Sequence, residues 1–177
     1  MPVAALHNLG TQSQYMSHDR PSAPAGYYWH PVPEMKTSLL VPDGWSVRSA
    51  HDERVASYYF ARGSLEVPTE RRVALSVLAI TQSSHEHDAS EYAMEFLASV
   101  CQGRELVNIF DEQQMSLFIG NGCFARDEGT VLYMLMIANP KTDSLYQFLF
   151  SAPDAEWDGA WPVGEKMIGS VVLDPAL

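Results

Sequence analysis

The sequence predicts an α+β fold, an α/β/α sandwich built on a mainly antiparallel central sheet. Short apolar segments separated by turn residues fill most of the chain, which indicates strands that follow one another directly. Only one mid-chain segment and one C-terminal segment show the spacing of an amphipathic helix. Residues 71–80 are apolar on both sides of a predicted strand, which favours helices on both faces of the sheet.

The chain divides into a polar tail and one domain. Residues 1–26 are rich in Ser, Pro and Gly and lack either structural period, so we expect a tail or surface arm. Residues 27–177 are expected to form a single domain. Its first segment, "YYWHPVPEM" at 27–35, predicts an extended stretch that lies along the domain. As a hypothesis, this segment at 27–35, which we call the arm, docks against the sheet or exchanges with a neighbouring copy.

Turn residues separate the predicted strands. In the turn 42–44, Pro presets φ and Gly supplies a positive φ. The Asn-Gly pair at 121–122 predicts a tight turn, and residues 139–143 are expected to close a hairpin. The predicted strands, in chain order, are 35–41, 45–50, 55–62, 71–80, 105–110, 114–120, 123–126, 130–138 and 144–150.

Two helices are predicted. Asp88 and Glu91 have the spacing of a capping box, so the mid-chain helix is expected to begin there. Pro162 and Gly159 favour a kink in the C-terminal helix, or two consecutive helices. The apolar rows that predict the mid-chain helix are Tyr92, Phe96 and Val100, and Ala93, Leu97 and Cys101.

Charge and hydropathy exclude several classes of function. The chain has 22 acidic and 11 basic residues, a formal net charge of −11. Such a surface repels phosphate backbones and anionic lipids, so no nucleic-acid partner is expected. No segment approaches the roughly 20 apolar residues that a membrane helix needs, so no membrane insertion is expected. Residues 1–10 lack the pattern of a signal peptide, and we expect a cytoplasmic protein.

The two cysteines, Cys101 and Cys123, are too few for a disulfide scaffold. Cys101 closes an apolar helical face and Cys123 follows a predicted turn. We expect both to be reduced and partly buried.

The histidines of "SSHEHDASEY" at 83–92 suggest a metal site. In an extended loop, His85 and His87 project to one side, and with Glu86 they are candidates for zinc or manganese ligands. A structural zinc site needs four ligands and a catalytic site three, whereas only two good ligands are local. A solvated loop before the helix is the alternative interpretation. The His-Asp-Glu cluster at 51–53 is interpreted as a solvated turn.

No motif predicts an enzyme or a cofactor. Residues 120–125 match the dinucleotide pattern G-x-G-x-x-A, but that pattern functions where it opens a helix. Here another turn and another strand follow, so a hairpin is the favoured interpretation. We expect a non-enzymatic protein without a cofactor.

Aromatic residues near the ends of the domain are candidates for contact with a partner. Trp45 and Trp161 are expected to pack in the core. Trp157 follows an acidic segment in a first helical turn, where partial exposure is expected. With Tyr28 and Trp29 of the arm, it forms the set of candidate binding residues, because exposed aromatics are enriched at binding hot spots.

Three segments resemble a known group of proteins. "LLVPDGWSV" at 39–47, the long hairpin at 131–161 and "MIGSVVL" at 167–173 are similar to the PsbP/Mog/DcrB-like superfamily. The resemblance covers about residues 34–173. It implies an α/β/α sandwich and a role in binding, and it brings no shared catalytic residues to this chain.

The sequence therefore predicts a non-catalytic binding or accessory domain that engages a protein partner or self-associates. The alternative is a metal-binding or small-ligand-binding protein that uses the His85–His87 loop. The first predicts an exposed aromatic surface, and the second a concave site where histidines and carboxylates converge.

Overall fold

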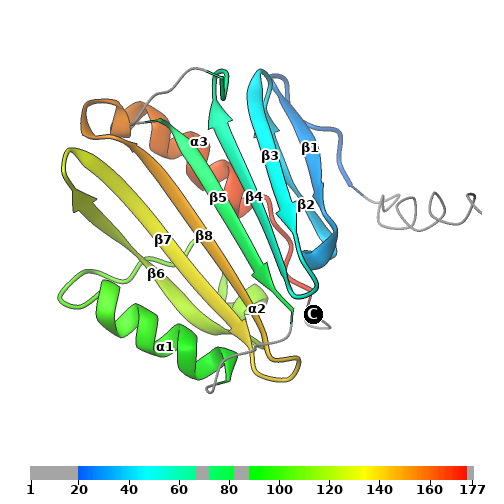
Figure 1. Ribbon diagram of the computed structural model, residues 1–177, viewed down its shortest axis with the longest axis vertical. Coiled ribbons are helices and arrows are strands. Elements are labelled where there is room, and N and C mark those ends of the chain that lie inside the picture. The colour runs from blue at the N-terminus through cyan, green and yellow to red at the C-terminus, as the bar shows by residue number, and fades with distance from the viewer. Residues whose placement is uncertain (1–19, 67–71, 82–87, 175–177) are drawn as a thin grey trace, which may run out of the picture.

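The computed structural model describes residues 20–66, 72–81 and 88–174 (Figure 1). Within them, six antiparallel strands form the main sheet, in the order β3-β4-β5-β8-β7-β6, and β1 and β2 form a small antiparallel sheet. The strands are β1 Tyr27–Val32, β2 Thr37–Pro42, β3 Trp45–His51, β4 Val55–Arg62, β5 Ala74–Ile80, β6 Ile119–Asp127, β7 Thr130–Asn139 and β8 Ser144–Pro153. The α-helices are α1 Ala89–Val100, α2 Glu112–Met115 and α3 Trp157–Gly169, and the 3-10 helices are η1 Pro33–Met35 and η2 Asp154–Glu156.

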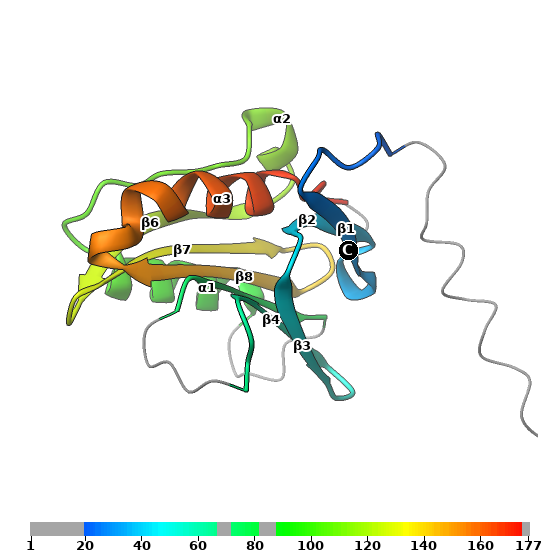
Figure 2. The ribbon, with the colours of Figure 1, turned by 90° about the horizontal axis from the view of Figure 1, so that it is seen from above.

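The elements form the predicted three layers. Helix α3 and the small sheet lie on one face of the main sheet, and α1 lies on the other (Figures 1 and 2). The larger apolar core fills the space between the main sheet, α3 and the small sheet, and a smaller core lies beneath α1. The prediction of an α+β fold, an α/β/α sandwich with a mainly antiparallel sheet, is confirmed.

The α1 layer covers only half of its face of the sheet. Helix α1 packs against β6, β7 and β8. Among the described residues, no helix packs on the same face of β3, β4 and β5, and we call this face, with the adjoining part of β8 around Leu149, the open half of the sheet. The register places Arg48, Tyr59, Ser76 and Leu149 in one row across this open half. A hollow of about 370 Å³ lies over them. Within the described part of the chain, β5 is therefore not covered by helices on both faces, contrary to the prediction for residues 71–80.

The start of α1 and the predicted long hairpin are confirmed. The Asp88 carboxylate accepts a hydrogen bond of 2.7 Å from the Glu91 amide, the N-cap contact that the spacing predicted. Strands β7 and β8 pair over their whole length around the turn at 140–143. This hairpin lies inside the sheet, and most of its apolar residues are buried on both faces.

Strand β6 corrects the predicted turn at 121–122. It runs without interruption from Ile119 to Asp127, paired with β7. Gly120 has φ +149°, and a Cβ there would lie 2.0 Å from the Met136 carbonyl oxygen. A Cβ on Gly122 would lie 2.5 Å from the Tyr133 hydroxyl. These glycines therefore serve a close approach to β7, and not a turn.

Other predicted elements are also corrected. Residues 105–110 form no strand beyond a single bridge from Leu106, and the predicted strand at 114–120 is replaced by α2 and the start of β6. The C-terminal segment is one α-helix with Pro162 inside its first turns, preceded by η2. Among the described residues, no helix has both the length and the apolar character to cross a membrane.

The prediction of reduced cysteines is wrong. Cys101 and Cys123 form a disulfide, with their Cα atoms 5.8 Å apart. Cys101 follows the last turn of α1, and Cys123 lies on the face of β6 that α1 covers. The bond closes a loop with a sequence separation of 22 residues and ties the helix to the sheet edge.

Candidate functional site

Trp157 belongs to a cluster of aromatic rings between the start of α3 and the main sheet. Because Trp157 and Trp161 are four residues apart, they share one face of the helix, and their rings stack with centroids 5.3 Å apart. Phe124 of β6 meets both rings edge-on, at 5.8 Å and 5.0 Å. Tyr133 and Phe150 complete the cluster from β7 and β8. Such contacts hold Trp157 in one orientation.

Trp157 is only partly buried, and its free side lines a hollow of about 450 Å³, which we call the Trp157 groove. Arg126 of β6 lies opposite Val131 of β7 in the register, and Phe124 lies two residues before Arg126, so all three project to the same face of the sheet. The residues that line the groove are Arg104, Phe124, Ala125, Arg126, Val131 and Trp157.

Two ion pairs fix the turn that leads into Trp157. Arg126 pairs with Asp154, and Arg62 pairs with Glu156, so η2 is bound to β6 on one side and to β4 on the other. The Arg126 side chain is still 69% exposed. Exposed pairs of this kind contribute little stability, but they set the geometry of the groove wall.

The chain after α1 brings Arg104 to the groove. The Arg104 amide donates to the Cys101 carbonyl at 3.0 Å, and the Arg104 guanidinium donates to the Val100 carbonyl. Because Cys101 is bonded to Cys123 of β6, the disulfide anchors the turn that carries Arg104. Two residues later, Leu106 forms a bridge with Cys123, so this segment follows the edge of β6.

Tyr133 connects the same segment to the middle of the sheet. Its hydroxyl donates to the Val107 carbonyl at 2.7 Å. Burial raises the pKa of this phenol well above its ordinary value, so Tyr133 stays a neutral donor at physiological pH. The contact holds residues 104–107 against the groove.

The arm aromatics lie elsewhere and already have partners. Tyr28 and Trp29 stand on β1, which pairs with β2 along its whole length. The Trp29 indole N–H donates to the Pro21 carbonyl at 3.0 Å, and the Arg20 guanidinium lies 5.3 Å from the ring centroid. Tyr28 packs against the larger core. The arm therefore docks on its own domain.

The predicted binding residues do not form one site. The arm meets the last turns of α3, where the Lys166 ammonium lies 4.1 Å from the Tyr27 ring centroid, whereas Trp157 begins that helix. Trp45 and Trp161, predicted as core residues, are partly buried against the larger core.

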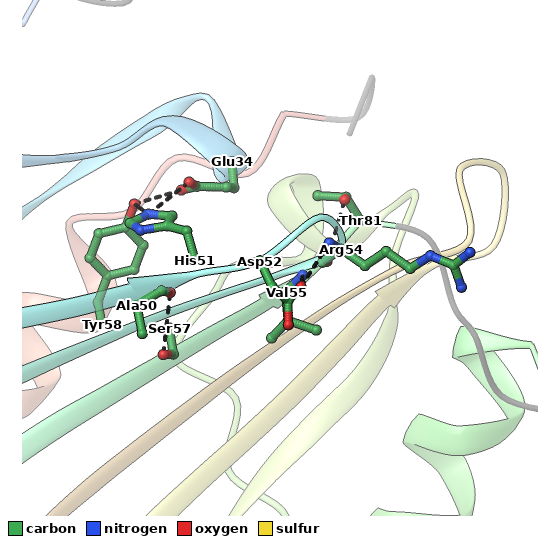
Figure 3. A network of polar contacts seen from close by, with 9 residues as sticks. All are labelled: Glu34, Ala50, His51, Asp52, Arg54, Val55, Ser57, Tyr58 and Thr81. Carbon is green, nitrogen blue, oxygen red and sulfur yellow. Dashed lines mark hydrogen bonds and ion pairs between the residues drawn. The ribbon is translucent and has the colours of Figure 1, made fainter.

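A second polar cluster joins the small sheet to the main sheet (Figure 3). The Tyr58 hydroxyl donates to Glu34 Oε2 at 2.6 Å, and His51 Nε2 lies 3.0 Å from both Glu34 Oε1 and the Tyr58 oxygen. Burial, reinforced by the Glu34 carboxylate, raises the pKa of the Tyr58 phenol. His51 therefore reaches across to η1 and does not simply stand in a solvated turn. This cluster fastens η1 to the β3–β4 hairpin.

The turn beside this cluster behaves as predicted. The Asp52 carboxylate accepts hydrogen bonds from the Arg54 and Val55 amides at 2.9 Å and 2.8 Å. These bonds favour the ionised form and lower the pKa of Asp52.

The predicted metal site lies outside the described residues, because His85 and His87 fall within 82–87. Across the ranges 20–66, 72–81 and 88–174, no three side chains of His, Cys, Asp or Glu are grouped so as to hold a metal ion.

Sequence reasoning missed most of the groove. Arg104 and Arg126 are ordinary surface arginines in the sequence, and only the pairing of β6 with β7 and the disulfide bring them beside Trp157. One signal was present: Phe124 and Arg126 alternate in a β-strand pattern before an apolar hairpin. That pattern places both residues on one face of a strand, but it does not predict that Trp157 and Arg104 lie beside them.

Comparison with known proteins gives only a likeness of fold. No protein-family model and no curated protein matches the chain. The solution structure of cyanobacterial PsbP (CyanoP) from Synechocystis sp. PCC 6803 is similar with a TM-score of 0.44 and 16% identity, covering 90% of this chain and 99% of that one. A crystal structure from Bacteroides thetaiotaomicron VPI-5482 has a TM-score of 0.41 and 12% identity, covering 78% of this chain and 45% of that one. Neither likeness identifies a partner or a functional residue.

Proposed function

We propose that this chain is a non-catalytic binding domain of the PsbP-like type, and that the Trp157 groove is its contact surface for another protein. The observation that carries the proposal is a half-buried tryptophan, fixed by stacking, that lines the same hollow as Arg104 and Arg126. Tryptophan and arginine are the residue types most enriched at the energetic centres of protein interfaces.

The groove is formed before any partner arrives. Aromatic contacts hold Trp157, ion pairs hold η2, and the disulfide anchors the turn of Arg104. A surface that is already ordered loses little side-chain entropy on binding, so more of the contact energy is available as affinity.

The chemistry of the lining favours binding over catalysis. The six side chains that line the groove are two arginines, phenylalanine, alanine, valine and tryptophan. None of these six side chains is a nucleophile or a proton acceptor at neutral pH. They offer apolar surface and fixed positive charge, which suit recognition of a partner.

Affinity capture tests the proposal. The tagged protein is incubated with lysate of its own host at moderate salt, and bound proteins are identified by mass spectrometry. We expect a stoichiometric partner that Trp157→Ala loses and that Trp29→Ala, the matched change in the arm, retains. Circular dichroism verifies that both variants are folded, and sedimentation velocity separates a different protein from a second copy. A partner held equally by both variants would contradict the role of the groove.

The cytoplasmic address stays a prediction, and the Cys101–Cys123 disulfide argues against it. Structural disulfides persist mainly in oxidising compartments. Alkylation of free thiols in intact host cells before lysis tests the address. Two alkylated cysteines would support the cytoplasm, and two protected ones would support an oxidising compartment.

A further inference from the structure

We infer that the Trp157 groove recognises an acidic segment of its partner, one that places a carboxylate side chain next to an aromatic or large aliphatic side chain. This inference rests on the proposed function and adds the chemistry of the partner. It follows from the charge, the shape and the lining of the groove.

The lining of the groove is richer in basic residues than the chain as a whole. Acidic residues outnumber basic residues 22 to 11 overall, whereas the described residues that line the groove include two arginines and no carboxylate. A guanidinium has five N–H donors. Arg126 therefore keeps donors for a second anion while it pairs with Asp154, and its side chain is largely exposed. Arg104 is exposed on the same hollow.

The apolar part of the groove selects what accompanies the carboxylate. Trp157, Phe124 and Val131 present aromatic and aliphatic surface, and the hollow of about 450 Å³ is large enough for one or two side chains. An aromatic or large aliphatic residue of the partner would stack on Trp157 and exclude water from the neighbouring arginines. The removal of water strengthens a charge-assisted hydrogen bond.

The lining of the groove disfavours other ligands. A small anion such as inorganic phosphate can contact the arginines but gains nothing from the apolar wall of Trp157, Phe124 and Val131. A basic segment is repelled by Arg104 and Arg126. A carboxylate carried on an apolar segment can contact both the arginines and the apolar wall.

A selection experiment tests the inference. A displayed library of random 12-residue peptides is selected on the wild-type protein, and the enriched peptides are synthesised. We expect Asp or Glu next to Phe, Trp or Leu. We expect Arg104→Glu to weaken binding at least about tenfold, since a hydrogen bond to a charged group is worth about 1.5–3 kcal/mol. Arg48→Glu, the same charge change in the open half of the sheet, should have no effect.

Arg104→Gln and thermal melts show whether a loss of binding is a loss of charge or of folding. Peptides without acidic residues, no enrichment at all, or equal binding to Arg104→Glu would each overturn the inference. If Trp157→Ala abolishes binding but Arg104→Glu does not, the acidic preference fails and the groove stands. If neither variant changes binding to peptide or partner, the proposed function fails as well.

Discussion

The arm and the Trp157 groove are two aromatic regions with the same predicted role and different structures. In the arm, Trp29 donates to the Pro21 carbonyl and lies beneath Arg20, on a strand that pairs fully with β2. In the groove, Trp157 stacks on Trp161 but keeps one side on a hollow that Arg104 and Arg126 also line. Both tryptophans are half-buried. Partial exposure is therefore common to both tryptophans, and what distinguishes Trp157, the proposed contact residue, is an ordered ring beside an unfilled hollow.

The largest expected effect is the loss of stability when the arm is deleted. Deleting residues 1–33 removes β1, its ladder with β2 and the fully buried Val32. We expect the free energy of unfolding to fall by at least about 3 kcal/mol, because a buried strand and its hydrogen bonds are lost. Urea denaturation measures the change. Unchanged stability together with unchanged oligomeric mass would show that the arm is not part of the domain.

The disulfide is expected to stabilise the part of the fold that forms the Trp157 groove. Replacing Cys101 and Cys123 by serine opens a loop with a sequence separation of 22 residues, and we expect a loss of about 3 kcal/mol. Since the disulfide anchors the turn of Arg104, peptide binding should weaken too. Calorimetry of the oxidised protein, the reduced protein and the double variant measures the effect. Equal stability of all three would contradict a structural role for the bond.

Alkaline pH is expected to destabilise the fold through Tyr58, whose hydroxyl donates to Glu34 of the arm. Its folded-state pKa is raised by burial and by Glu34, so its stabilising contribution is complete below pH 10, near the ordinary tyrosine pKa, and is lost as the pH rises further. Each such tyrosine lowers the free energy of unfolding by up to about 1.4 kcal/mol per pH unit above that point. Tyr58→Phe should flatten the decline between pH 10 and 11 relative to wild type. Denaturation at pH 8, 10 and 11 measures the decline, and parallel declines would contradict the raised pKa of Tyr58.

The smallest expected effect is that of Trp29→Ala on its own domain. The indole loses one hydrogen bond and the contact with Arg20, together about 1–2 kcal/mol. Partner and peptide binding should be unchanged. Isothermal titration with a selected peptide and a chemical melt check both statements. A loss of binding as large as that of Trp157→Ala would erase the distinction between the two regions.

The sequence predicted the fold well where local patterns determine it. The alternation in residues 55–62, the apolar strands around the hairpin and the Asp88 cap all follow from period and capping rules, and all are confirmed. The short helix α2, which lies where a strand was predicted, also has a local capping signal: the Asp111 carboxylate accepts a hydrogen bond from the Gln114 amide at 2.7 Å.

The rest depends on which distant residues meet. Cys101 is bonded to Cys123 because α1 lies over β6, and no local pattern encodes that pairing. The same is true of Glu34 with His51 and Tyr58, which unite three elements. Of the candidate site, the sequence predicted Trp157 but not the arginines beside it.

Site-specific photocrosslinking in host lysate tests whether a partner contacts the Trp157 groove. p-Benzoylphenylalanine is placed at the exposed position 105, next to Arg104 and outside the lining of the groove, at position 29 in the arm and at position 48 in the open half of the sheet. Crosslinked proteins are identified by mass spectrometry. We expect one discrete protein to be crosslinked from position 105 and from neither of the others. Crosslinking of the partner from position 29 or 48, with none from position 105, would contradict the assignment of the groove as the contact surface.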